Sequence, residues 1–257
     1  MSRPLIRQLP EEEELLRKRE ELAAIRATLA ERELELVDFR SQLAAFEGRY
    51  LREVGSLYAE LDEWNARIAE LRDHLNPSAA STEEAAKARR QARQTYEDAH
   101  GEGSKTREFI PSDELKRAYR EAAKRMHPDF AADPADLKRR TRSMAAANSA
   151  YESGDAEALR RILDEYEASA EAVTGEGIGT ELVRTIRQIS SAKSRLAAIV
   201  RELAALSESE IALLKKQSEE TQDQGRDLLA ELATAVRQQI ELAKRAYESL
   251  AKEARPA

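Results

Sequence analysis

The chain has 257 residues, of which 41% are hydrophobic, 35% are charged and only 5% are aromatic, and its formal net charge is −7. This composition is typical of long helices and coiled coils, and it argues against a thick globular core. The absence of cysteine excludes a disulfide framework, a thiolate metal site and a cysteine nucleophile, and the acidic balance argues against nonspecific nucleic-acid binding.

The N-terminal segment Met1–Arg7 lacks the apolar stretch of a secretory signal, and no run of about twenty apolar residues occurs along the chain. The lack of cysteine fits a reducing compartment. We therefore expect a soluble, cytoplasmic protein that has no membrane partner.

Residues 11–75 carry the heptad pattern of a coiled coil. A large apolar residue, mostly leucine, recurs at every seventh position from Leu15 to Leu71. Halfway along, the second apolar stripe moves from three to four residues after the first, and Gly48 and Gly55 flank this stutter, so we expect the helix to relax or bend there. Such a stripe must pair with another helix. Glu11–Glu14 stand where a leucine-zipper DNA binder needs basic residues, which excludes that class.

Residues 76–107 are predicted to form a polar helix and a linker. Pro77 ends the coiled coil, and a short helix then runs to about Ala99. Its basic run, Lys87–Arg93, is interpreted as a solvated helix face. Gly101–Ser104 is predicted to be a flexible joint.

Residues 108–170 contain the most informative pattern. Ser112 is a good N-cap for a basic amphipathic helix that ends near Met126, because Pro128 disfavours helical geometry in the residue before it. The pattern therefore predicts that His127-Pro128-Asp129, the tripeptide, lies in an exposed turn. A second helix is predicted from about residue 135 to 153, with Gly154 as its C-cap and Asp155 capping a third helix.

This segment resembles the J domain of DnaJ-type co-chaperones. Glu114–Asp129 is similar to the second helix and signature loop of that family, and Met144–Tyr151, with Asn148 followed by Ala150-Tyr151, is similar to its third helix. The resemblance implies that the protein binds a DnaK-type (heat-shock 70 class) chaperone and stimulates ATP hydrolysis by it. It implies that the tripeptide makes the contact and that helix residues dock beside it: His127, Pro128 and Asp129 together with Lys116, Arg117, Tyr119, Arg120, Lys124 and Arg125.

The residues themselves support an electrostatic role for this helix. Residues 111–142 contain nine Lys/Arg against six Asp/Glu, a local excess of positive charge in an acidic chain. Lys116, Arg117, Arg120, Lys124 and Arg125, the basic face, suit steering toward an acidic partner surface, although an ordinary solvated face carries the same pattern. For Tyr119 the sequence leaves packing and partner contact equally open.

The chain departs from the J-domain pattern in three places. No Tyr-x-x-Leu-Gly first helix precedes Ser112, and we expect Phe109 and Ile110, or the helix over Ala85–Tyr96, to fill its space. Phe130 stands where a lysine commonly follows the tripeptide. No Gln-Lys-Arg run follows in the third predicted helix of this segment, the counterpart of the family's fourth.

Residues 178–254 are predicted to form a helical hairpin or coiled coil. One helix is expected up to about Leu203, and Ser207 is expected to cap a last helix that ends near Glu253. Oligomerisation, docking against the N-terminal coil and client binding are all open functions for it.

The sequence thus predicts an elongated all-α protein with a J-like module between coiled-coil arms that serve self-association or client targeting. We expect no enzyme activity, no catalytic residues and no metal, because the three histidines, His74, His100 and His127, form no cluster or catalytic pair in the sequence. We expect no cofactor, and no bound nucleotide, because no phosphate-binding glycine loop occurs. One alternative is a structural coiled-coil scaffold whose module is uncoupled from a chaperone. Another is a nucleic-acid adaptor that uses Arg89–Arg93 and Lys138–Arg142, which no aromatic stacking platform accompanies.

Overall fold

The structure is a computed structural model that describes residues 10–101, 103, 109–168 and 177–253. Every regular element in these ranges is a helix and none is a strand, which confirms the all-α prediction. No helix in the described ranges is long and apolar enough to span a membrane. The predicted joint at Gly101–Ser104 lies partly outside the described residues.

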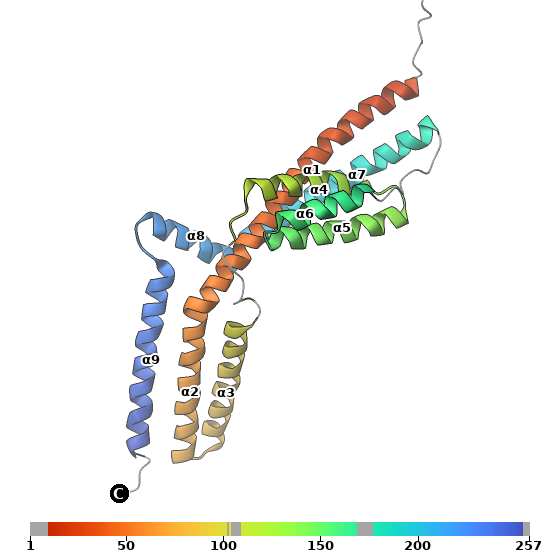
Figure 1. Cartoon of the computed structure of the whole chain (residues 1–257). Coiled ribbons are helices and arrows are strands. Elements are labelled where there is room, and N and C mark those ends of the chain that lie inside the picture. The colour runs from red at the N-terminus through yellow and green to blue at the C-terminus, as the bar shows by residue number, and fades with distance from the viewer. Residues whose placement is uncertain (1–9, 102, 104–108, 169–176, 254–257) are drawn as a thin grey trace, which may run out of the picture. The chain divides into compact units, whose positions relative to one another are not determined.

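Figure 1 shows the helices in chain order, coloured from red at the N-terminus to blue at the C-terminus. Their bounds are α1 Pro10–Tyr50, the π-helical segment η1 Leu51–Gly55, α2 Ser56–Leu75, α3 Ala79–His100, α4 Asp113–Met126, the 3₁₀ turn η3 Pro128–Phe130, α5 Pro134–Glu152, α6 Ala156–Ala168, α7 Ile178–Ser207, α8 Glu210–Asp223 and α9 Leu228–Glu253.

The chain forms two compact units, each built from separate stretches of sequence. Unit 1 comprises Met1–Ser41 and Phe109–Ser207, and unit 2 comprises Gln42–Glu108 and Glu208–Ala257. The sequence predicted four consecutive segments, namely 11–75, 76–107, 108–170 and 178–254. The structure divides differently, because the heptad stripe of α1 is shared between the two units and each unit takes one part of the C-terminal helices.

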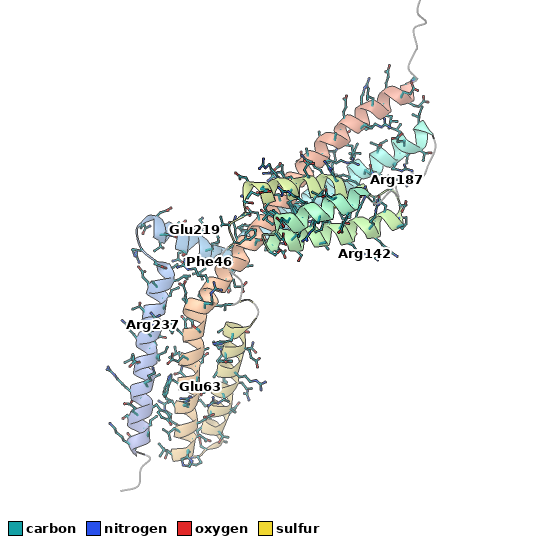
Figure 2. All side chains as sticks on the ribbon, in the orientation of Figure 1. Phe46, Glu63, Arg142, Arg187, Glu219 and Arg237 are labelled. Carbon is teal, nitrogen blue, oxygen red and sulfur yellow. The ribbon has the colours of Figure 1, made fainter. Side chains whose placement is uncertain are left out.

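In unit 2, α2 lies between α3 and α9 (Figure 1). Arg89 of α3 donates hydrogen bonds to Glu63 and Glu70 of α2, at 2.6 and 2.7–2.8 Å; Glu63 is labelled in Figure 2. On the other side of α2, the Trp64 ring meets the Tyr247 ring of α9 edge to face, with centroids 5.7 Å apart. Arg89 of the basic run therefore pairs with α2, whereas the sequence predicted a solvated helix face for the whole run.

The predicted stutter corresponds to the π-helical segment Leu51–Gly55. Where apolar residues of one stripe follow each other at two successive intervals of four, the stripe stays on one face only if the helix has more residues per turn than the 3.6 of an α-helix. A π-helical turn also does so, and it places Val54 in a buried cluster with Leu229 and Ala233 of α9. Phe46, labelled in Figure 2, packs on the edge of this cluster.

The prediction of one last helix after Ser207 is wrong. Ser209, not Ser207, caps α8, and the helix then breaks before α9. Gly225 has a φ of +77°, which ends α8. Asp227 caps α9 by accepting a hydrogen bond from the backbone N–H of Leu229 at 3.0 Å.

Unit 1 pairs α1 with α7 in parallel. The ion pairs Arg19–Glu181 and Arg40–Glu202 run in the same order along both helices. Between them lies an apolar cluster whose buried members are Leu22, Leu29, Leu36, Phe130, Ile189, Ala192 and Ile199. The stripe of the N-terminal coil is thus covered within the chain, by docking of a C-terminal helix against it.

Candidate functional site

The hairpin of α4 and α5 has the bounds that its local signals predict. The Ser112 hydroxyl accepts a hydrogen bond from the backbone N–H of Leu115 at 3.1 Å and starts α4. The helix stops at Met126 because His127, before Pro128, takes an extended ψ of 132°. Asp133 caps α5, which returns antiparallel to α4, and Asp155 caps α6. The tripeptide therefore lies at the point where the chain reverses.

Tyr119 packs inside unit 1 and does not present its ring to a partner. Its side chain is 1% exposed, and its hydroxyl donates a hydrogen bond to Oδ1 of Asn148 at 2.8 Å. Its ring meets that of Tyr151 edge to face, with centroids 5.0 Å apart. The inclusion of Tyr119 among the partner-contacting residues is corrected, because α5 covers it. Tyr151 is likewise a core residue, whereas Asn148 is half-buried.

Helix α1 forms one wall of the core around α4, α5 and α6. Ala30, Leu34 and Val37 of α1 are buried in one cluster with the inward faces of α4, α5 and α6. The Tyr151 hydroxyl also donates a hydrogen bond to Oδ1 of Asp38 at 3.2 Å.

The sequence predicted that Phe109 and Ile110, or the helix over Ala85–Tyr96, would pack where a first helix is absent before Ser112. Phe109 does pack on the cluster of α1 with α4, α5 and α6, and its ring centroid lies 5.5 Å from that of Tyr151. The prediction for Ile110 is wrong, since it is 80% exposed. The helix over Ala85–Tyr96 packs on α2 instead, within unit 2.

The imidazole of His127 is buried, so the prediction of an exposed turn is wrong for this residue. It is 3% exposed, and its Nδ1 accepts a hydrogen bond from the backbone N–H of Asp129 at 3.2 Å. The neutral ring therefore carries its proton on Nε2, which donates to Oε1 of Glu33 at 3.0 Å. Arg195 of α7 donates to both oxygens of Glu33, at 2.6 and 3.0 Å. Two helices that the sequence placed elsewhere cover the turn.

The charges around the imidazole compensate one another. Burial opposes ionisation of Glu33, but hydrogen bonds from His127 and Arg195 outweigh it and lower the pKa of the Glu33 carboxyl. Burial raises the pKa of Asp129, and the nearby His127 partly offsets this effect. Oδ2 of Asp129 lies 3.7 Å from Nδ1 of His127 and accepts no hydrogen bond from the residues that the structure describes.

Phe130 anchors the turn to α1 and α7. Its side chain is 2% exposed and belongs to the apolar cluster between these helices. Its carbonyl accepts a hydrogen bond from Nε2 of Gln188 at 2.8 Å, and the guanidinium of Arg26 lies 4.6 Å from its ring centroid. The apolar ring of Phe130 thus packs between α1 and α7.

Asp136 and Arg140 brace the turn from the side of α5. The Arg140 guanidinium donates to Oδ2 of Asp136 at 2.8 Å and to the backbone carbonyl of Arg125 at 2.7 Å, where α4 ends. Oδ2 of Asp136 also accepts from the backbone N–H of Ala132 at 3.0 Å. Sequence reasoning missed this brace, although an aspartate four residues before an arginine in one helix is a usable signal.

Replacing Asp136 with asparagine should lower the free energy of unfolding by about 3 kcal/mol at neutral pH, because Asp136 is buried and Arg140 would lose its counter-charge. Burial raises the pKa of Asp136, but hydrogen bonds from Arg140 and Arg139 lower it to about 2. This stabilisation is complete above the ordinary aspartate pKa of about 4 and is lost as the pH falls through about 2.

The difference between wild type and Asp136→Asn should therefore narrow as the pH is lowered over this range. Urea titrations at several pH values would measure it. Asp164→Asn, on an exposed position of α6, is the control. A pH-independent difference would contradict the assignment.

The basic face lies on the surface of α4, partly paired with acidic residues. Arg120 pairs with Glu31 of α1 at 2.8 Å, and Lys116 lies 3.9 Å from Asp38. Glu121, on the same helix, pairs with Lys124 and Arg125 at 3.3 and 3.4 Å. Arg117 is exposed. All five cations are at least partly accessible, with those nearest α1 already facing its carboxylates.

A groove of about 670 Å³ opens beside the tripeptide. Its lining includes Asp129, Ala131, Val183, Arg184 and Arg187; Figure 2 labels Arg187 on α7. The side chain of Asp129 is 28% exposed. Within the tripeptide, therefore, the aspartate is reachable from solvent while the histidine is covered.

The described residues include no group of His, Cys, Asp or Glu that could hold a metal ion. The basic runs of the adaptor alternative are largely engaged in ion pairs. Arg89 pairs with Glu63 and Glu70, and Arg93 pairs with Glu97, while Arg139 and Arg140 pair with Asp136. Arg142 projects from α5 away from the other helices (Figure 2).

Comparison with protein-family models, with curated proteins and with solved structures gives no match for this chain.

Proposed function

We propose that this protein is a J-type co-chaperone that binds a DnaK-type chaperone in its ATP-bound state and stimulates its ATP hydrolysis. The observation that carries the proposal is the helical hairpin that reverses at His127-Pro128-Asp129, with a basic face along α4 leading to it. The bond between Tyr119 and Asn148 links the two sequence segments that resemble the J domain.

The chemistry required of this chain is recognition alone. The cations of the basic face would steer the hairpin to an acidic surface of the chaperone. Asp129, which is partly exposed, and then His127 would contact the chaperone beside that acidic surface. The chaperone would hydrolyse its own ATP, so this chain needs no cofactor. The remaining helices would direct the activity to a client or assembly in the cytoplasm, and the exposed apolar residues Val183 and Ile186 on α7 are candidates for self-association.

A steady-state assay tests the proposal. Wild-type protein should raise the ATPase rate of a DnaK-type chaperone, and His127→Gln should return it to the basal rate, because the imidazole of the tripeptide would be lost. His74→Gln, at an exposed histidine near the end of α2, is the matched control and should stimulate like wild type. Equal rates with wild type and His127→Gln would reject the proposal.

A second candidate, a structural scaffold with an uncoupled module, is favoured by the burial of His127 between Glu33 and Arg195. In that case the tripeptide serves only to join α4 and α5 to α1 and α7. His127→Gln would then lower the melting temperature, and neither it nor the wild type would change the ATPase rate.

A further inference from the structure

We infer that α7 is a removable cover that holds the tripeptide closed, and that its displacement from α1 opens the docking site; this rests on the proposed function. Helix α7 lies directly against η3, the turn that contains Pro128 and Asp129. Gln188 and Arg195 of α7 hold the turn at two points, one through the carbonyl of Phe130 and one through Glu33.

The carboxylates of α1 in the closed site are tied to α7 through Glu33, because Arg195 donates hydrogen bonds to both of its oxygens. The three carboxylates Glu31, Glu33 and Asp38 lie against Arg120, His127 and Lys116 respectively. The two cations and the imidazole are groups that an acidic surface of the chaperone would bind. The closed site thus already contains, within the chain, carboxylates of the kind that a partner would supply.

The contacts of α7 and α1 differ in kind, which indicates which helix moves. The face of α1 with Ala30 and Leu34 is built into the core of α4–α6. Helix α7 contacts α1 and the turn through a separate cluster, which includes Ile199. Displacing α7 therefore leaves the core around Tyr119 complete, whereas displacing α1 removes one wall of it.

A partner can make a first contact with the site while α7 is still in place. Asp129 borders the groove, and Arg117 and Arg125 are exposed. A partner that makes this encounter and binds the uncovered state more tightly shifts the equilibrium toward it. Its apparent dissociation constant is the intrinsic value divided by the fraction of molecules in which α7 is displaced.

The test compares neighbouring residues of α7 in the full chain. Ile199→Ala removes a fully buried side chain from the α1–α7 cluster, and Val200→Ala changes a residue that is 56% exposed. Two quantities are measured: the rate at which diethylpyrocarbonate modifies His127, read by peptide mass spectrometry, and the concentration that gives half-maximal stimulation of a DnaK-type ATPase. The exposed His74 is the internal reference for the modification.

Ile199→Ala should raise the modification rate of His127 by roughly thirtyfold and lower the half-maximal concentration, because the cost of displacing α7 falls. Val200→Ala should change neither. Gln188→Ala, which removes only the hydrogen bond to the carbonyl of Phe130, should act in the same direction by a smaller factor. It keeps the test valid if Ile199→Ala does not fold.

The outcomes separate the two claims. Unchanged modification of His127 in both folded variants overturns the cover, as does faster modification combined with weaker stimulation. Faster modification with no stimulation by any variant or by wild type overturns the proposed chaperone function and leaves the cover standing. Faster modification with stimulation at lower concentration supports both.

Discussion

A fragment limited to residues 108–170 should be largely unfolded when it is expressed alone. The module resembles a domain that folds by itself, but here α1 supplies Ala30, Leu34 and Val37 to its core. Burial of a side chain such as valine or leucine contributes about 1.5–3 kcal/mol, against a total stability of about 5–15 kcal/mol for a typical domain. Without this wall, Tyr119 and Tyr151 would face water.

Far-UV circular dichroism and thermal melting would show the result. The control is a fragment of residues 109–207 mixed with a peptide of residues 10–41, which together contain the stretches that make up unit 1 from Pro10 onward. This mixture should regain helicity and a cooperative transition. A cooperative transition in the 108–170 fragment alone would show that α1 is dispensable for the core.

Replacing Phe130 with alanine should lower the free energy of unfolding of unit 1 by about 3–5 kcal/mol. The ring is 2% exposed and contacts both the apolar residues between α1 and α7 and the guanidinium of Arg26. Its loss leaves a cavity where the turn meets these helices. Because that contact also holds the turn closed, the same variant should expose His127 to chemical modification.

Denaturant titration of Phe130→Ala against Leu137→Ala measures the effect. Leu137 is an apolar residue of α5 that is 45% exposed, so its truncation should cost less than about 1 kcal/mol. Equal losses in the two variants would mean that Phe130 is not an anchor. A large loss without exposure of His127 would mean that the ring stabilises the fold without controlling access.

The hairpin was predictable because its signals are local. Ser112, Pro128 and Gly154 mark helix ends through backbone chemistry that a single sequence displays, and the structure places the ends of α4 and α5 within a residue of those predicted. The break between α8 and α9 was equally local, since Gly225 and Asp227 are a C-terminal stop and an N-cap. It was overlooked because the apolar stripe continues across it.

The surroundings of the tripeptide were not predictable because they depend on long-range contacts. Glu33 lies 94 positions before His127, and Arg195 lies 162 positions after Glu33. In the sequence each is one more charged residue in a helix rich in them. Nothing in the spacing of α1 indicates that one of its faces pairs with α7 while the adjacent face completes the core of α4–α6.

The brace of Asp136 and Arg140 draws only on α4, α5 and the loop between them. Displacement of α7 therefore leaves this brace in place, and a visiting chaperone would meet a loop that is still held from the side of α5. Little conformational entropy would then be lost on association. Displacement of α7 and binding of the chaperone to the turn then become separate steps. A substitution can change one of these steps without changing the other.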